Sequence, residues 1–140
     1  MKKIILIIFI ITILNASARI GETRAQCDKR YGDVIGEKDG AIVYQTKEIL
    51  IIVRFHNKIC QVIVYQQFQN RNTKDLADDQ IELLLKVNAG KRIFSSNGIK
   101  SWVTSDKYLA AKYNEGKQLV IITKSLFDWQ LKQNNNIKSK

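Results

Sequence analysis

The sequence has little of what enzymes and metal proteins use for chemistry. It contains one histidine, His56, and two cysteines, Cys27 and Cys60. Two sulfurs and one histidine at these positions match none of the usual ligand spacings of zinc sites. A histidine-activated nucleophile would have to use His56, which lies in a predicted hairpin turn and is typical of an exposed polar residue. We therefore predict no catalytic residue, no metal site and no cofactor.

Long apolar runs are also scarce, and the clearest one stands at the N-terminus. Lys2 and Lys3 precede an apolar stretch at residues 4–14, and Ala16-Ser17-Ala18 follows it. This order is typical of a secretory signal peptide with cleavage after Ala18, and the stretch is shorter than the about 20 residues of a membrane-spanning helix. We predict a bacterial protein that is secreted or periplasmic, begins at Arg19 and has no transmembrane segment after cleavage.

Basic residues outnumber acidic ones, and the formal net charge is +10. An excess of positive charge attracts anionic partners such as lipid headgroups, cell-wall polymers or nucleic acid. The basic residues are scattered singly along the chain, however, as on an ordinary solvated surface. We expect no nucleic-acid partner and keep an anionic envelope surface as an alternative.

The local patterns predict helices and strands in alternation. A capping box at Thr23 and Gln26 opens a helix at residues 24–31, and a polar-capped apolar stripe predicts another at 79–89, with Asp79 as its cap. The predicted strands are residues 41–46, 48–55, 59–66, 99–104, 107–113 and 117–123. Residues 125–131 fit a helix or a strand, and 134–140 are predicted to form a disordered tail.

The two halves of the chain align without a gap at an offset of 58 residues, which places Tyr44 on Trp102 and Ile63 on Ile121. The expected fold is therefore α+β, with two tandem units of a short helix followed by a three-stranded antiparallel sheet and the helices on one face. The units are residues 22–68 and 76–124. Together they make a single domain at residues 19–133.

Cys27 and Cys60 are expected to form a disulfide, because they are the only internal pair in a chain predicted to leave the cytoplasm. Two buried unpaired thiols are the alternative. If the bond forms, Cys60 points at the first helix, and strand alternation then predicts that Val62 and Val64 do so too. By the offset, Val120 and Ile122 would face the second helix.

One region combines aromatic and basic residues in a way that suits stacking on a sugar or base. Core aromatics flanked by solvated lysines are the commoner origin of such a pattern. The residues of this predicted surface are Lys100, Trp102, Lys107, Tyr108, Lys112 and Tyr113.

The start of the mature chain carries a resemblance. Arg19-Ile20-Gly21-Glu22-Thr23, then Cys27 and Arg30-Tyr31-Gly32, resemble a group of uncharacterised exported bacterial proteins that begin with Arg-x-Gly-Glu-Thr, a cysteine and Arg-Tyr-Gly. The resemblance implies export and a shared fold and adds no catalytic residue. At the level of fold alone, the predicted architecture is similar to the β-lactamase inhibitor protein and to the small lipoprotein of the outer-membrane assembly machinery. The chain differs from that lipoprotein in lacking an acylated cysteine.

These observations favour a non-enzymatic exported protein that binds or inhibits a protein partner. The alternative is a basic envelope-associated protein that binds anionic lipid or cell-wall polymer.

Overall fold

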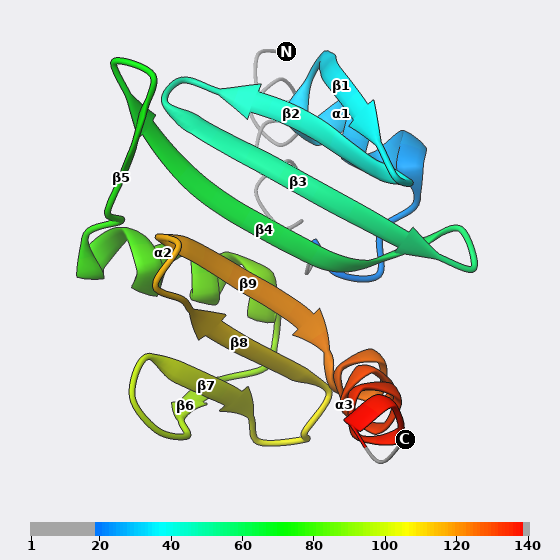
Figure 1. Ribbon diagram of the computed structural model, residues 1–140. Helices are drawn as coiled ribbons and strands as arrows, with labels where there is room; N and C mark the ends of the chain where they lie inside the picture. The colour runs from blue at the N-terminus through cyan, green and yellow to red at the C-terminus, as the bar shows by residue number, and fades with distance from the viewer. Residues whose placement is uncertain (1–18, 139–140) are drawn as a thin grey trace, which may run out of the picture.

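The computed structural model describes residues 19–138 (Figure 1). The predicted signal peptide at residues 1–18 lies outside them. Within the described range the helices are α1 (Arg24–Tyr31), α2 (Asp78–Ala89) and α3 (Lys124–Lys138). The strands are β1 (Val34–Lys38), β2 (Ala41–Thr46), β3 (Ile49–His56), β4 (Ile59–Gln69), β5 (Asn72–Lys74), β6 (Phe94–Ser96), β7 (Ser101–Thr104), β8 (Leu109–Tyr113) and β9 (Gln118–Thr123).

All of these strands belong to one antiparallel sheet. Its order is β1-β2-β3-β4-β9-β8-β7-β6, and β5 pairs with the end of β4. The expected fold of two tandem helix-plus-three-strand units is therefore wrong. Residues 62–66 of β4 pair with residues 118–122 of β9, and this pairing joins the strands that follow α1 and those that follow α2 into a single nine-stranded sheet.

The sequence patterns did not predict the three short strands β1, β5 and β6. β1, β5 and β6 lie at sheet edges or at the end of a hairpin, and most of their residues are exposed. β1 contains Gly36, Glu37 and Lys38, which have low strand propensity, and its pairing with β2 shifts register between Val34 and Gly36. Pairing with a neighbouring strand, rather than local sequence preference, makes these segments extended.

The first predicted helix is confirmed. The Thr23 side chain caps α1 by accepting a hydrogen bond from the Gln26 backbone, and the Gln26 side chain accepts one from the Thr23 backbone. Gly32, with a φ of 85°, ends the helix. The second helix starts slightly earlier than expected, with Ala77 rather than Asp79 at its cap position, where the Gln80 side chain accepts a hydrogen bond from the Ala77 backbone.

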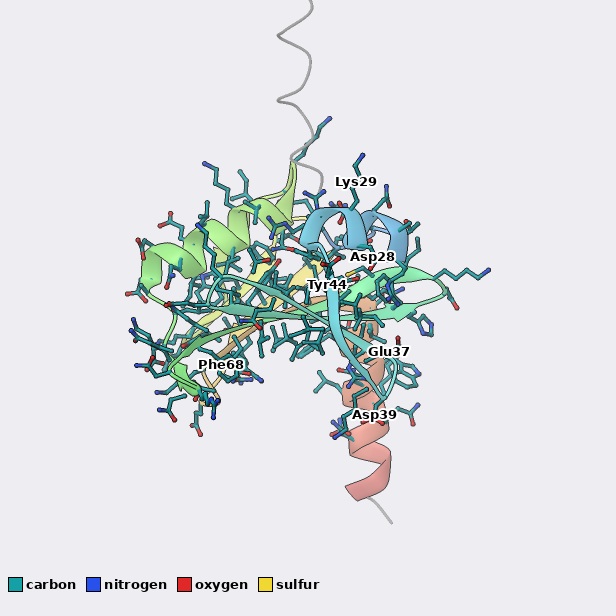
Figure 2. The ribbon with its side chains drawn as sticks, turned by 90° about the horizontal axis from the view of Figure 1, so that it is seen from above. Asp28, Lys29, Glu37, Asp39, Tyr44 and Phe68 are labelled. Atoms are coloured by element: carbon teal, nitrogen blue, oxygen red, sulfur yellow. The ribbon has the colours of Figure 1, made fainter. Side chains whose placement is uncertain are left out.

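Helices α1 and α2 both cover the same face of the sheet, as Figure 2 shows. The core lies between these helices and the strands. Tyr44, Ile63 and Tyr65 are fully buried there on β2 and β4, and Leu119 and Ile121 are fully buried on β9. The core is thus continuous across the β4–β9 junction.

We predicted that Cys60, Val62 and Val64 of β4 point towards the first helix. Only the prediction for Cys60 is correct. Arg54 pairs with Val62 and Phe55 with Cys60, so Gln61 is an extra residue that forms a β-bulge. Beyond the bulge the alternation is inverted. Ile63 therefore joins Cys60 in the core beneath the helices, and Val62 turns to the other face.

The same error carries over to β9. We expected Val120 and Ile122 to face α2, but Leu119 and Ile121 belong to the core cluster and the other two do not. We had predicted which residues of β9 face the helices by analogy with β4, using the 58-residue offset. Because the bulge in β4 inverts the alternation there, the prediction for β9 was wrong as well.

The other face of the sheet carries no such helical layer. Val43, Ile52, Val64 and Val120 lie there, half-buried, on four successive strands. Helix α3 starts directly after β9 and projects from the sheet on the side opposite α1 and α2 (Figure 2). The sheet is therefore apolar on both faces and covered by α1 and α2 on one.

Helix α3 settles the choice left open for residues 125–131, which are helical. The helix continues to Lys138, so residues 134–138, which we expected in a disordered tail, are helical as well. Phe127, Trp129 and Leu131 on this helix are 37%, 57% and 46% exposed. No helix among residues 19–138 has the length and apolar character needed to cross a membrane.

Candidate functional site

A groove with a volume of about 750 Å³ lies between α2 and the edge strands β6 and β7. Ile81, Leu85 and Ala89 form one wall because residues four apart share a face of a helix. Phe94 and Trp102 lie on the adjacent strands β6 and β7 and form the other wall. The groove is therefore lined mainly by apolar side chains, as ligand sites usually are.

The apolar walls of this groove are only partly covered. Ile81 and Leu85 are buried, but Phe94 and Trp102 remain half-buried at the surface. Ile93, next to Phe94 and also lining the groove, is 73% exposed. Exposed apolar area gathered in one place is typical of an interaction site.

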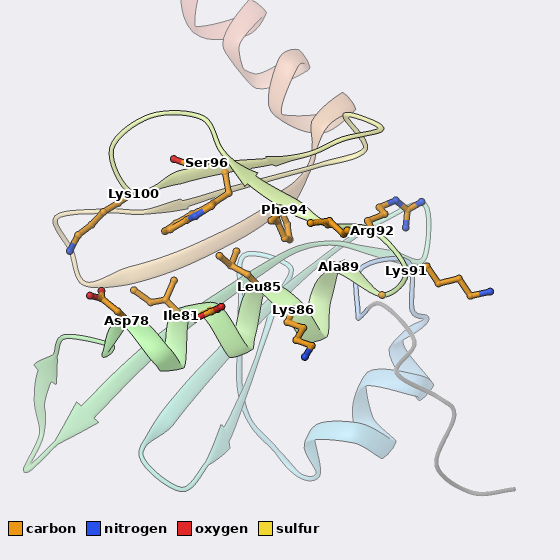
Figure 3. A pocket seen from close by; sticks show the side chains of 14 residues that line it. Asp78, Ile81, Leu85, Lys86, Ala89, Lys91, Arg92, Phe94, Ser96 and Lys100 are labelled. Atoms are coloured by element: carbon orange, nitrogen blue, oxygen red, sulfur yellow. The ribbon is translucent and has the colours of Figure 1, made fainter.

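The two ends of the groove differ in charge, as Figure 3 shows. Lys91 and Arg92 lie together at the end where α2 stops. Asp78 and Lys100 lie at the opposite end and carry opposite charges. One end therefore presents an excess of positive charge and the other is balanced.

Arg92 is held in place by its neighbours. Its Nε lies 2.6 Å from Oδ2 of Asp106, and its guanidinium stacks 4.2 Å from the centre of the Tyr108 ring. The Thr104 hydroxyl, the Tyr108 backbone N–H and the Arg92 guanidinium together lower the pKa of Asp106 to about 2. The carboxylate therefore stays charged and fixes Arg92, whereas Lys91 is exposed.

The structure brings together four of the six residues of the predicted basic-aromatic surface. Lys100 and Trp102 line the groove, and Nζ of Lys100 lies 5.0 Å from the centre of the Tyr113 ring. Tyr113 itself is 6% exposed and donates a hydrogen bond of 2.9 Å to Asp75. Burial and this bond raise its pKa. The buried ring of Tyr113 thus packs against the Lys100 ammonium group, and Tyr113 itself exposes little surface to a ligand.

Lys112 is the fourth of these residues. It neighbours Tyr113 on β8, and the two line a hollow of about 630 Å³ together with Lys100. The remaining two residues of that surface lie elsewhere. Lys107 and Tyr108 lie in and after the turn between β7 and β8, where Tyr108 stacks with Arg92. Sequence reasoning missed Phe94 and Arg92, although the apolar pair Ile93-Phe94 after Gly90 was a signal that the predicted elements left unused.

Cys27 on α1 and Cys60 on β4 are neighbours, and both are fully buried. The disulfide that we expected between them is not formed in this structure, and both cysteines are free. A hydrogen bond between the two thiols lowers the pKa of Cys27, and the same bond together with burial raises that of Cys60. Cys60 is therefore a neutral thiol inside the core, and the pair lies where a bond would tie α1 to β4.

An ion pair with a buried carboxylate lies beside the cysteines. Glu22 is 5% exposed, and both of its carboxylate oxygens lie 3.1 Å from Nε of Arg30. The Cys27 sulfur lies 4.0 Å from the same carboxylate. Arg30 thus compensates the charge that Glu22 brings into the protein interior.

A polar network links the two helices through β4. The Tyr65 hydroxyl accepts a hydrogen bond of 3.0 Å from the buried Asn88 side chain of α2. It lies 3.4 Å from the Tyr31 hydroxyl of α1 and 3.3 Å from Nη1 of Arg19. Tyr65 therefore connects α1, α2 and the residue at the predicted mature N-terminus.

The described residues contain no group of three or more histidine, cysteine or acidic side chains arranged to hold a metal ion. His56 is the last residue of β3 and is exposed, one position before the turn in which we had placed it. Asn57 and Lys58 form that turn, with φ values of 51° and 66°. These values fit the two-residue hairpin turn that matches the twist of the flanking strands.

Comparison with protein-family models, curated proteins and solved structures finds no match to the chain. The resemblance to exported bacterial proteins therefore remains a prediction.

Proposed function

We propose that the chain is a non-enzymatic binding protein whose groove between α2 and β6–β7 holds an apolar, acidic segment of a protein partner. The observation that carries the proposal is the partly exposed apolar wall of Phe94 and Trp102 with Lys91 and Arg92 at one end. An apolar side chain of the partner would cover the wall, and a carboxylate would lie at the positive end. Exposed apolar area provides affinity, and the charge at one end sets the direction of the bound segment.

We also propose that the protein works outside the cytoplasm, after cleavage of residues 1–18. The signal-like order of Lys2, Lys3, the apolar stretch and Ala18 supports this. Ile20, two residues after the proposed cleavage site, is 4% exposed, and the Gly21 backbone donates a hydrogen bond of 2.9 Å to Cys60. Intact-mass analysis of the exported protein should show a chain that starts at Arg19, and retention of residues 1–18 would contradict export by cleavage.

The groove is tested with peptides of known sequence. A displayed random-peptide library is selected on the protein, and the enriched peptides are resynthesised with each acidic residue replaced by its amide. Trp102 reports binding by fluorescence in a Trp129→Phe background, which leaves one tryptophan in the chain. We expect enriched peptides to combine apolar and acidic residues and to lose affinity when the acid becomes an amide.

Two variants with matched controls decide where such peptides bind. Lys91→Glu should weaken binding about three- to tenfold, whereas Lys29→Glu, on the exposed side of α1, should not change it. Phe94→Ala should abolish most of the affinity, and Leu83→Ala, 60% exposed on the outer face of α2, should leave it intact. Equal effects of the groove variants and their controls would contradict the groove as the binding site.

A second candidate function rests on α3. Its exposed Phe127 and Leu131 lie one helical turn apart on the same face as Lys124, and such a face suits the interface of an anionic membrane. Vesicles with anionic lipid distinguish this function from the first. Binding to them that weakens with salt and is lost in Leu131→Ala would favour it, and salt-independent binding would contradict it.

A further inference from the structure

The free edge of β6 borders the groove. β6 is the last strand of the sheet order, and among the described residues no strand pairs with its outer side. Phe94 and Ser96 of β6 and Trp102 of β7 line the groove, so the groove lies over one face of these strands. A strand added to the free edge would extend the same face and place its side chains beside the groove.

The backbone of Phe94 and Ser96 points outward at this edge. Asn97, just after β6, donates a backbone hydrogen bond of 2.8 Å to the carbonyl oxygen of Ser101 on β7. In an antiparallel pair every second residue bonds to the partner strand, so Ser95 also bonds to β7. Phe94 and Ser96 then direct their N–H and C=O groups to the free side, where they are available to an added strand.

The opposite edge of the sheet is protected against such pairing, whereas the edge at β6 is not. The pairing of β1 shifts register between Val34 and Gly36, and Glu37 and Lys38 follow on the same strand. Irregular pairing and charged side chains are common devices that block an edge. β6 pairs with β7 without a shift, and its residues carry no charge. Of these two edges, the one at β6 is suited to accept a strand.

Charge at the groove favours one direction for that strand. Lys91 and Arg92 directly precede β6 and lie at one end of the groove. A strand antiparallel to β6 brings its C-terminal residues to this end, and the pairings between the described strands are all antiparallel. An acidic residue on the C-terminal side of the strand therefore meets the two cations.

We propose that the partner segment binds as an extended strand antiparallel to β6, with apolar residues at alternate positions and an acidic residue on their C-terminal side. The inference rests on the proposed function of the groove and adds the conformation and the direction of the bound segment. Residues opposite Phe94 and Ser96 exchange backbone hydrogen bonds with them and direct their side chains into the groove. The acidic side chain, two residues further on the same face, pairs with Lys91 and Arg92.

Two synthetic peptides of equal composition test the direction. The forward probe is acetyl-Thr-Leu-Thr-Val-Thr-Glu-amide, and the reversed probe is acetyl-Glu-Thr-Val-Thr-Leu-Thr-amide. Both are titrated against protein from cells that express the full chain, with Trp102 fluorescence in the Trp129→Phe background as the signal. We expect the forward probe to bind about five- to tenfold more tightly than the reversed one. Lys91→Glu should remove most of this difference.

Single N-methyl groups on the forward probe test the backbone hydrogen bonds. N-methylation of its valine removes an N–H that faces β6 and should weaken binding about tenfold. N-methylation of the threonine just before the valine removes an N–H that faces away from β6, and it should weaken binding much less. This pair of peptides differs only in the position of one methyl group.

A change in the protein removes the matching donor. Ser96→Pro deletes an outward N–H at a position where an edge strand tolerates proline, and it should weaken binding about tenfold more than Ser96→Ala, which keeps the N–H. Thermal unfolding checks that both variants fold, and the peptide comparison does not depend on them. In hydrogen exchange followed by NMR, the amide protons of Phe94 and Ser96 should be more protected in the complex, and that of Ser95 should change less.

Four results would overturn the proposal. Equal weakening by the two N-methyl groups, in a probe whose binding Phe94→Ala removes, would exclude the added strand and leave the groove standing. Tighter binding of the reversed probe would exclude the direction. No binding of either hexapeptide up to about 10 mM would exclude the strand, and the groove would then depend on the library peptides alone. A dimer of the free protein that Ser96→Pro dissociates would assign the edge to a second copy of the chain.

Discussion

The two helices that cover the sheet do so to different degrees. Helix α1 places Cys27 and Tyr31 against the strands, and both side chains are buried. Helix α2 buries most of Ile81 and Leu85, yet these side chains also line the groove of about 750 Å³ between α2 and the strands β6 and β7. The short edge strand β6, of three residues, is too small to close that space. We call the half that contains α1 and β1–β4 the sealed half, because α1 packs closely on its strands. We call the half that contains α2 and β6–β9 the open half, because its groove leaves apolar side chains exposed.

The two halves also differ in what their polar contacts hold in place. In the sealed half Arg30 pairs with the buried carboxylate of Glu22, and the Tyr65 hydroxyl joins α1 to Asn88 of α2. The ion pair of the open half, between Arg92 and Asp106, is half-exposed and fixes one side of the groove. The comparison indicates that polar groups stabilise the first half and position a binding surface in the second.

The largest test asks whether the halves fold together. Ile63 and Ile121 pair across the β4–β9 junction, and both are fully buried. Ile63→Ala and Ile121→Ala should each lower the free energy of unfolding by about 2–5 kcal/mol in a single cooperative transition. Urea unfolding followed by circular dichroism measures this loss. Val64 is half-buried on the sheet face that α1 and α2 leave uncovered, and Val64→Ala is the control. It should lower the free energy of unfolding by less than about 1.5 kcal/mol. Two separate transitions would show that the halves are independent.

The second test concerns the predicted disulfide, which belongs to the sealed half alone. Oxidation of Cys27 and Cys60 should raise the free energy of unfolding by about 3–4 kcal/mol, because the bond closes a loop of about 33 residues in the unfolded chain. Thiol labelling of the denatured exported protein should find no free thiol. Cys27→Ser should lose the difference between reduced and oxidised protein. Complete labelling of both cysteines in the exported wild type would contradict the bond.

The third test compares the two ion pairs. Arg30→Met leaves the buried Glu22 carboxylate without its cation and should cost about 2–3 kcal/mol, somewhat less than for a fully buried pair because the Arg30 side chain is 29% exposed. Adding Glu22→Gln should restore part of the loss. Arg92→Met, at the half-exposed pair, should leave the free energy of unfolding unchanged within error. Chemical denaturation of the four proteins checks the comparison, which fails if the two arginine variants lose equal stability.

The smallest expected effect is that the contribution of Asp106, in the open half, to stability depends on pH. The pKa of Asp106 is lowered from 3.8 to about 2, so its contribution to stability is present above pH about 4 and disappears as the pH falls through 2. The difference in melting temperature between wild type and Asp106→Asn should therefore shrink between pH 4 and pH 2. Thermal unfolding at several pH values measures it. A difference that grows on acidification would contradict the assigned hydrogen bonds.

Much of the local structure could be predicted from the sequence. The capping box at Thr23 and the stop at Gly32 located α1 to the residue, because capping depends on neighbours a few positions apart. The strands β2, β3 and β4 were recognised from their β-branched runs. The disulfide expected between Cys27 and Cys60 is not formed in this structure, although both residues are buried. Of the predicted surface, Lys100, Trp102, Lys112 and Tyr113 lie close together.

The candidate sites depended on residues that local patterns do not connect. Leu85 and Trp102 are 17 positions apart and line one groove because α2 lies beside the strands β6 and β7. Phe94 forms a wall of the groove because β6 pairs with β7, with Phe94 opposite Thr104.

The sequence by itself determined the helix caps, the main strands and the positive charge, because each depends on residues near one another or on composition alone. The tertiary structure decided that one sheet forms rather than two, through the pairing of β4 with β9. It also decided which face of β4 is buried. The bulge at Gln61 arises from pairing with β3, and one extra residue in a strand of period two exchanges the two faces.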